Sequence, residues 1–330
     1  VYTAARVPGN YLPPASLQRG WRERVRIWWR EVDRVLLLLI GLLMATGILA
    51  VAAASPASAD QLSTAKVTLD PFMFFKRHIV FQLLGLALMI GLSFASRDSA
   101  RRIGILVGAV MLALLFVVPL IGEEKNGARR WINVGMSLQP SEFLKPGFAI
   151  ICAWILSWRL RDPGLPVIWY VSGLMGLIAA LLMLQPNLGD AILFGGIWLV
   201  MVLLAGVTWQ RIAGLIGGGA GALVLAYVFY DNARHRIDGF LGGGTAFDQV
   251  DLAQRTITAG GWTGAGLWLG TRKMNLPEAH TDYIFSVIGE EFGLVMCAAI
   301  VLLYLALVLR ALVRLVGEDN LFALLAAAGL

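Results

Sequence analysis

The sequence predicts an all-α membrane protein, a polytopic bundle of eight complete helical spans and the start of a ninth. Of the 330 residues, 58% are hydrophobic and only 15% are charged, whereas a soluble protein carries about 25% charged residues. The hydrophobic residues fall into runs of about 20, the length that crosses a bilayer core. The alternating ten-residue segments typical of a membrane β-barrel are not visible.

The apolar runs give the order of the spans. They lie at 35–54, 79–96, 103–121, 141–158, 167–184, 190–207, 212–230 and 283–309, and a ninth run begins near Leu321. We expect a basic segment at 1–34 and a single transmembrane domain at 35–330. The two cysteines, Cys152 and Cys297, lie inside apolar runs, which indicates small core residues and no disulfide or metal site.

Basic residues predict the orientation of the bundle. Arginines concentrate in the N-terminal segment and in alternate loops, so the positive-inside rule places the N-terminus in the cytoplasm. The net charge of +6 then reflects topology and contact with anionic lipid, and we expect no nucleic-acid partner. Three loops on the other side, at 55–78, 122–140 and 231–282, are also basic. The last is the longest, and loops of that length are usually functional or disordered. Within it, Val250–Ile257 is predicted to form a short amphipathic helix on the membrane.

The first candidate motif is Asn126–Asn133, which contains Arg129, Arg130 and Trp131. In a loop both arginines can point at one anion, and guanidinium groups bind phosphate oxygens in a bidentate way. Trp131 is placed to pack on a sugar or a lipid chain. The simpler alternative is a solvated turn in which Glu123 and Glu124 hold the arginines.

The second motif is Gln139–Lys145. Pro140 marks a helix start, and Glu142 and Lys145 share one face because they are three residues apart. Lys145 then lies roughly 6 Å inside the span, where an ionisable side chain indicates a functional site. The alternative is a structural pair that fixes helix packing.

The third motif runs from Leu276 to Glu291. Asp282 lies where the long loop enters the eighth span, so it is either a helix N-cap or a carboxylate whose desolvation suits a general base. Glu290 and Glu291 lie about two turns deeper and need partners. Lys145 is the lysine that lies inside a predicted span, so we expect it to pair with one of these two acids.

Three glycine- or proline-containing stretches have simpler readings. Gln185–Asp190 lies between two predicted spans, and its simpler interpretation is a tight outer turn. Gly217–Gly221 is predicted to allow close helix packing. Gly264–Gly270 superficially looks like a dinucleotide-binding loop, but no strand precedes it, so we reject that interpretation.

Together these motifs resemble the SEDS family (shape, elongation, division and sporulation proteins). The resemblance covers nearly the whole chain from Asp33, and it rests on four blocks in the right order: Asn126–Asn133, Gln139–Lys145, Gln185–Gly189 and Pro277–Phe292. Asp70–Phe72, Phe74–Arg77, the basic N-terminal segment and Leu276–Asp282 resemble the division members more than the elongation members.

The resemblance implies a peptidoglycan glycosyltransferase of the bacterial cytoplasmic membrane that polymerises lipid II at the division septum, with inversion at the sugar carbon. It implies a class B penicillin-binding protein and other division proteins as partners. Asp282 resembles the family's essential acid. The implied substrate contacts are Arg129, Arg130, Trp131, Glu142, Lys145 and His280, and Gln185, Glu290 and Glu291 are polar residues within the membrane.

The resemblance leaves several points open. Asp282 acts either as base or as ligand of a divalent cation, Mg²⁺ or Mn²⁺. The family block at Gln185 usually reads Gln-Pro-Asp, whereas this chain carries Asn187, so a carboxylate role there is in doubt. The family has ten spans, so we expect this chain to end within its ninth. Competing functions are an elongation-type polymerase, a lipid II flippase and a division scaffold without chemistry.

Overall fold

The computed structural model describes residues 20–63, 67–125, 128–133, 135, 137–160, 162–238 and 249–330. Parts of five predicted features lie outside these residues: the first 19 positions of the basic segment, 64–66 of the loop at 55–78, Asn126 and Gly127 of the first motif, 134 and 136 of the loop at 122–140, and 239–248 of the loop at 231–282. The helices are α1 Trp21–Glu31, α2 Arg34–Leu62, α3 Met73–Ser93, α4 Arg97–Ile121, α5 Pro140–Ser157, η1 Trp158–Leu160, α6 Val167–Leu184, α7 Leu188–Leu204, α8 Trp209–Phe229, α9 Asp231–Asp238, α10 Gln249–Ala259, η3 Arg272–Asn275, α11 Ile284–Leu315 and α12 Leu321–Gly329.

The predicted spans are confirmed by this order. Among the described residues, seven helices are long and apolar enough to cross a membrane, and α7 is a shorter apolar helix at the position of the sixth predicted span. The largest difference is α2, which continues eight residues past the predicted end of the first span, through Pro56 to Leu62. Its extension buries a run of small residues, among them Ser55, Ala57 and Ser58.

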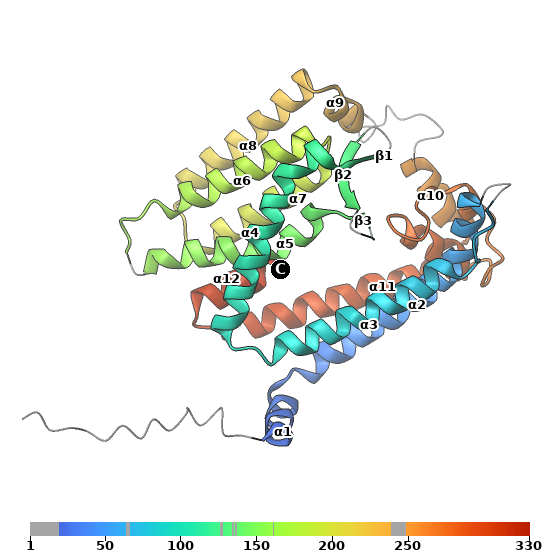
Figure 1. The fold of residues 1–330 in the computed structure, drawn as a ribbon, viewed down its shortest axis with the longest axis horizontal. Coiled ribbons are helices and arrows are strands. Elements are labelled where there is room, and N and C mark those ends of the chain that lie inside the picture. The colour runs from blue at the N-terminus through green and yellow to red at the C-terminus, as the bar shows by residue number, and fades with distance from the viewer. Residues whose placement is uncertain are drawn as a thin grey trace, which may run out of the picture.

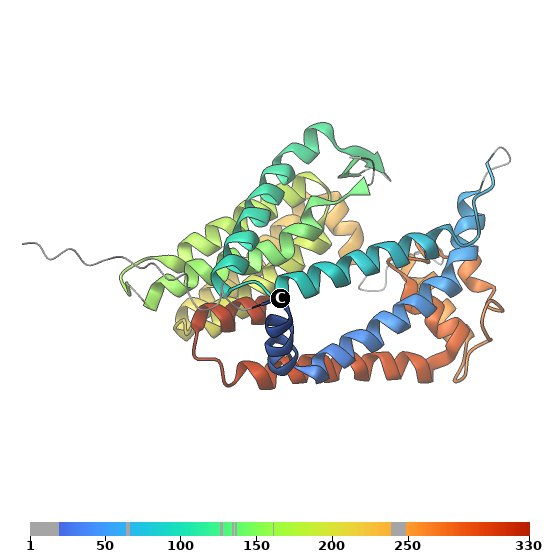
Figure 2. The same cartoon turned by 60° about the horizontal axis from the view of Figure 1, so that its bottom comes forward.

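The helices form two groups (Figures 1 and 2). In one group α2 packs against α3 and α11, and in the other α4 and α5 pack together with α6, α7 and α12. The second group holds the main hydrophobic core, where Phe148 of α5 meets Phe194 of α7 edge to face at 5.2 Å between ring centroids. Both side chains are fully buried.

A small antiparallel sheet, which the sequence did not predict, joins α4 to α5. Its strands are β1 Glu123–Lys125, β2 Ala128–Asn133 and β3 Ser137–Leu138, in the order β1-β2-β3. The expectation that Arg129 and Arg130 lie in a loop and point at one anion was therefore wrong. Successive side chains of a strand point to opposite faces, so the two arginines separate.

The long loop before α11 folds back onto a break in that helix. Gly293 interrupts this helix with φ 81° and ψ 175°, a backbone conformation that favours glycine. Loop groups replace the lost helical bonds: Leu294 N donates to Gly261 O at 2.9 Å, and Ala265 N donates to Glu290 O at 2.8 Å. An interruption at membrane depth is tolerated where the backbone is satisfied by protein in this way. The Gly264–Gly270 stretch thus has a structural role.

Two further expectations concern helices. The short helix predicted at Val250–Ile257 is confirmed by α10. The prediction of close packing at Gly217–Gly221 was wrong, because a Cβ atom added at any of its four glycines would meet no atom within 4 Å.

Candidate active site at one end of the bundle

Asp282 lies in the turn that leads into α11. The N-cap of α11 is Tyr283, and no side chain caps the helix, so Asp282 is not the predicted alternative, a helix cap. In the described part of the chain its carboxylate makes no hydrogen bond and no ion pair. Burial raises the pKa of Asp282, the negative charges of Glu278 and Glu142 raise it further, and His280 opposes them. A carboxylate with a raised pKa and no protein partner has the properties of a general base.

The turn before Asp282 is held in an unusual conformation. Glu278 has a positive φ of 51°, and its carbonyl accepts a hydrogen bond from Thr281 N at 3.0 Å. The Glu278 side chain also accepts one from Thr281 Oγ1 at 2.9 Å. Backbone strain of this kind clusters at functional sites, and here it fixes the approach to Asp282.

His280 packs inward beside this turn. Its ring contacts Phe74 of α3 at 3.9 Å between centroids, and its Nδ1 is buried without a hydrogen-bond partner among the described residues. Burial lowers the pKa of His280, against the opposing charges of Glu278 and Asp282. The imidazole is therefore neutral at neutral pH, and its contacts show packing of α3 against the turn.

A cluster of ionic groups lies at the start of α5 and α7. Lys145 Nζ is 2.8 Å from Glu142 and 3.0 Å from Asp190. Asp190 also accepts hydrogen bonds from Ser141 Oγ at 2.7 Å and from Asn187 Nδ2 at 2.6 Å. The expected pairing of Lys145 with Glu290 or Glu291 was wrong, because α5 packs against α7 rather than α11. Asp190 was missed, although an acid in the first turn of a span is itself a signal.

Arg130 ties the small sheet to the loop between α6 and α7. Its Nε donates to Gln185 O at 3.1 Å, its Nη2 donates to Pro186 O, and its guanidinium lies 6.0 Å from the Trp131 ring centroid. Gln185 is itself buried and donates to Leu115 O of α4 at 3.1 Å. Arg130 thus positions the loop that carries Asn187 and the start of α7.

Arg129 points to the other face of the strand and stays exposed. It donates to one carboxylate oxygen of Glu124 through Nε at 3.4 Å and through Nη2 at 3.3 Å. This is the ion pair that the solvated-turn interpretation predicts for Arg129. Because the pair is exposed, its guanidinium can exchange Glu124 for a substrate anion at little cost.

The two acids of α11, Glu290 and Glu291, are bound by η3 and not by Lys145. Lys273 of η3 forms an ion pair with Glu291 and donates to Ala53 O of α2 at 3.1 Å. Glu290 accepts the backbone N–H of Arg272 at 2.6 Å and of Lys273 at 2.9 Å. Lys273 was missed because η3 belongs to the long loop before α11 in sequence, and only the folded loop brings it to these acids.

Among the described residues, no group of three or more His, Cys, Asp or Glu side chains could hold a metal ion. The open carboxylate of Asp282 still fits the chemistry of Mg²⁺, which is commonly bound through one or two carboxylates together with substrate phosphates. A cation here would need oxygen atoms from the substrate.

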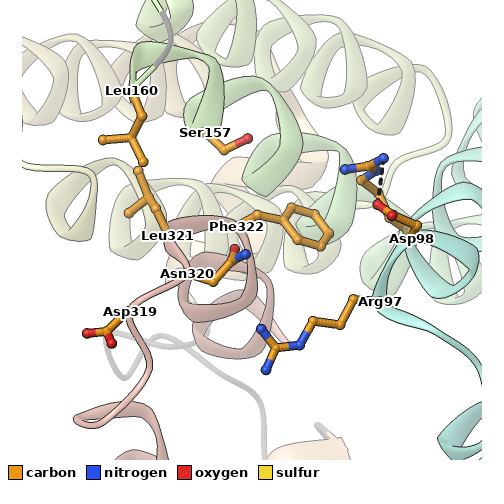
Figure 3. Close-up of a pocket in the computed structure, with 9 residues that line it drawn as sticks. Arg97, Asp98, Ser157, Leu160, Asp319, Asn320, Leu321 and Phe322 are labelled. Atoms are coloured by element: carbon orange, nitrogen blue, oxygen red, sulfur yellow. Dashed lines mark ion pairs between the residues drawn. The ribbon is translucent and has the colours of Figure 1, made fainter.

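A pocket of about 330 Å³ lies at the opposite end of the bundle, between α4 and the start of α12 (Figure 3). Its arginines are already paired: Arg97 with Glu318 at 3.2 Å and Arg101 with Asp98 at 2.9 Å. The pair of Arg97 and Glu318 joins the loop before α12 to α4, whereas Arg101 and Asp98 pair within α4, so this pocket is a structural junction and not a second reaction centre.

Comparison with known proteins identifies the class. Residues 33–330 match the model of the cell cycle protein family that comprises FtsW, RodA and SpoVE. A probable peptidoglycan glycosyltransferase FtsW of Caulobacter vibrioides is 32% identical over 96% of this chain and 80% of its own length. The corresponding protein of Halorhodospira halophila is 34% identical over 86% of this chain and 73% of its own.

Solved structures agree with this result. A chain of a peptidoglycan synthase complex aligns with a TM-score of 0.68 and 28% identity, over 91% of this chain and 82% of its own length. RodA of Thermus thermophilus aligns with a TM-score of 0.63 and 26% identity, over 91% and 81%. The chain therefore belongs to the SEDS family of polytopic membrane proteins. Its relatives group it with the FtsW-type peptidoglycan glycosyltransferases.

Proposed function

We propose that this chain polymerises lipid II, the undecaprenyl-diphosphate-linked disaccharide-peptide, into glycan strands during septal wall synthesis. The observation that carries the proposal is the unpaired carboxylate of Asp282, which has a raised pKa and lies close enough to Glu142 to feel its charge. In this proposal the turn before α11 and the ionic cluster of α5 and α7 form one site.

The proposed reaction is a single displacement. The 4-hydroxyl of the acceptor sugar transfers its proton to Asp282 as its oxygen attacks C1 of the donor sugar. The bond from C1 to the phosphate oxygen breaks, and the undecaprenyl diphosphate leaves with the electron pair. One displacement inverts an α-linked donor to a β-linked product, without a covalent enzyme intermediate.

The leaving diphosphate needs positive charge, because charge that develops in the transition state is best met by preorganised groups. Arg129 suits this role, since its guanidinium is exposed and, among the described residues, held by Glu124 alone. Lys145 supplies a second cation, fixed by Asp190 and Glu142. Arg130 acts less directly, because its hydrogen bonds position the loop before α7. A divalent cation bound to Asp282 and the diphosphate would supply the same charge.

The proposal places the site on the outer face of the cytoplasmic membrane, with the N-terminus in the cytoplasm. It also includes a class B penicillin-binding protein that crosslinks the new strands, which the similarity to a chain of a peptidoglycan synthase complex supports. A flippase would need polar groups along a path through the membrane. In the described part of the chain, the two acids of α11 are instead hydrogen-bonded to backbone N–H groups or paired with Lys273, so they do not line such a path.

The test is polymerisation by the purified complex of this chain with its penicillin-binding partner. Lipid II and Mg²⁺ are supplied, and the products are separated on a gel for the wild type and for Asp282→Asn. Long strands from the wild type and none from a folded Asp282→Asn support the proposal. Strands from both would remove Asp282 from the chemistry, and strands from neither would favour a scaffold.

A second variant separates the two roles of Asp282. A thiolate prefers soft metals, so Asp282→Cys should regain activity with Cd²⁺ but not with Mg²⁺ if this residue binds the cation. If Asp282 is the base, Cd²⁺ should restore nothing, and the acidic limb of the pH–rate profile should report its raised pKa.

A further inference from the structure

An apolar groove of about 1580 Å³ runs between α6, α7 and α8. Along α8 its lining extends from Arg211 to Ala226, which corresponds to roughly 22 Å of helix. This length is a large part of the bilayer's hydrocarbon core, which is about 30 Å thick. The groove therefore has the length of a lipid acyl chain rather than of a compact solute.

Several glycines line the groove and place no side chains in it. Gly196 of α7 and Gly214, Gly218 and Gly219 of α8 all line it, and a Cβ atom added at any of them would meet no atom within 4 Å. These glycines face open space and do not serve helix contact. An empty gap of this size would forfeit dispersion contacts along both walls, so in a membrane the groove is filled.

One end of the groove is lined by two arginines, Arg159 and Arg211. Arg159 donates through Nη1 to Ala205 O at 3.0 Å and to Gly206 O at 3.1 Å, which anchors its guanidinium beside the end of α7. In the described part of the chain, the guanidinium of Arg211 has neither a hydrogen bond nor an ion pair, unlike the paired arginines of the pocket in Figure 3.

The start of α8 adds to this anion site. Thr208 is the N-cap of α8, and its side chain makes no capping hydrogen bond. The first-turn N–H groups therefore have no side-chain acceptor, and a helix N-terminus attracts phosphate. Thr208, Arg159 and Arg211 all line the same end of the groove, at the opposite end of α5 and α7 from Asp190.

We propose that this groove binds one anionic glycerophospholipid. Its phosphate lies between Arg159, Arg211 and the start of α8, and its acyl chains lie along the glycine walls of α7 and α8. The lipid fills the space that α8 would otherwise have to close, and it thereby fixes α8 relative to α6. The site is distinct from the Asp282 site and does not depend on the proposed reaction.

The test is a lipid titration of the delipidated full chain in detergent, followed by native mass spectrometry. Phosphatidylglycerol is compared with the zwitterionic phosphatidylethanolamine for the wild type, Arg211→Gln and Gly218→Leu. The control is Gly85→Leu on α3, where an added Cβ also meets no atom within 4 Å but lies outside the groove. Both leucine variants gain helix propensity, so neither should impair folding.

We expect one tightly bound phosphatidylglycerol in the wild type and in Gly85→Leu. Arg211→Gln should weaken it about tenfold, because a charge-assisted hydrogen bond is lost, and Gly218→Leu should abolish it. Equal retention of both lipids, or equal retention in all four proteins, would overturn the proposal. So would a polypeptide that remains bound in the groove and is released by Gly218→Leu.

Discussion

Two clusters of opposite charges differ in their exposure, one where η3 meets α11 just before Gly293 and one at the start of α5 and α7. In the first, the side chains of Lys273 and Glu291 are only 1% and 0% exposed. In the second, Lys145 and Asp190 are 22% and 9% exposed, and Glu142 is 51% exposed. The first cluster is sealed, whereas the second is partly exposed, and the charge of its Glu142 acts on Asp282.

The difference separates two uses of charge within a membrane. In the sealed cluster, each carboxylate of α11 is satisfied by backbone N–H groups or by Lys273. The cluster holds the loop that carries η3 against α11 and α2. In the open cluster, Lys145 and Glu142 keep part of their surface free, which a substrate contact requires. A sealed cluster should therefore control folding, and an open one should control activity.

The largest effect is expected from Lys273→Met. It leaves Glu291 buried without its partner, and breaking a buried ion pair costs about 3–5 kcal/mol. The variant should lose most of its folded population, which size-exclusion chromatography and thermal unfolding in detergent would show. Lys76→Met, which removes an exposed ion pair with Asp70, is the matched control. A Lys273→Met protein as stable as this control would break the distinction between the clusters.

The open cluster is tested by moving its carboxylate. Asp190→Asn removes the buried anion beside Lys145, and loss of a hydrogen bond to a charged group costs about 1.5–3 kcal/mol. We expect polymerisation to slow by about tenfold or more while the protein stays folded. The double variant Asn187→Asp/Asp190→Asn should recover activity, because the two side chains already meet at 2.6 Å. Absence of recovery would show that the position of the carboxylate, and not its charge, matters.

The link between the open cluster and Asp282 is tested by pH. Glu278 and Glu142 both raise the pKa of Asp282, Glu278 more strongly. Removing either charge lowers this pKa, so the base stays ionised to lower pH. The acidic limb of the pH–rate profile should move to lower pH in Glu278→Gln, and by a smaller amount in Glu142→Gln. A shift to higher pH would contradict the assignment of this limb to Asp282.

The same pKa shift has a consequence for stability. A carboxyl group whose pKa is higher in the folded than in the unfolded protein opposes folding when it is ionised. This cost is absent at low pH and appears as the pH rises through the two pKa values. Asp282→Asn should therefore unfold at the same or a higher temperature than the wild type at neutral pH, although we expect it to be inactive. A clear loss of stability would indicate a structural role instead.

The smallest effect on stability is expected at the exposed ion pair of Arg129 and Glu124. Arg129→Gln should change the free energy of unfolding by less than about 1 kcal/mol, yet it should reduce polymerisation if Arg129 meets the diphosphate. Arg97→Gln, which breaks an exposed pair with Glu318 at the opposite end, should have the same small effect on stability and none on activity. Equal activity of both variants would remove Arg129 from the site.

The sequence by itself determined the membrane class, the order of the helices and the motifs. Runs of about 20 apolar residues are a local signal, because the bilayer requires each span to satisfy its own backbone. The span predicted at 167–184 coincides with α6. The same local reasoning drew attention to Asp282 and Lys145, since an ionisable group is costly within or beside a span.

Only the tertiary structure decided which charges meet. Lys145 pairs with Asp190 because α5 packs against α7, and Lys273 reaches Glu291 because the long loop before α11 folds into the break at Gly293. Arg129 and Arg130 separate because a short sheet replaces the expected loop. Lys145 and Asp190 lie 45 residues apart in the sequence. Helix periodicity constrains only neighbours that are three or four residues apart. Pairing across helices depends on packing, which a single sequence does not display.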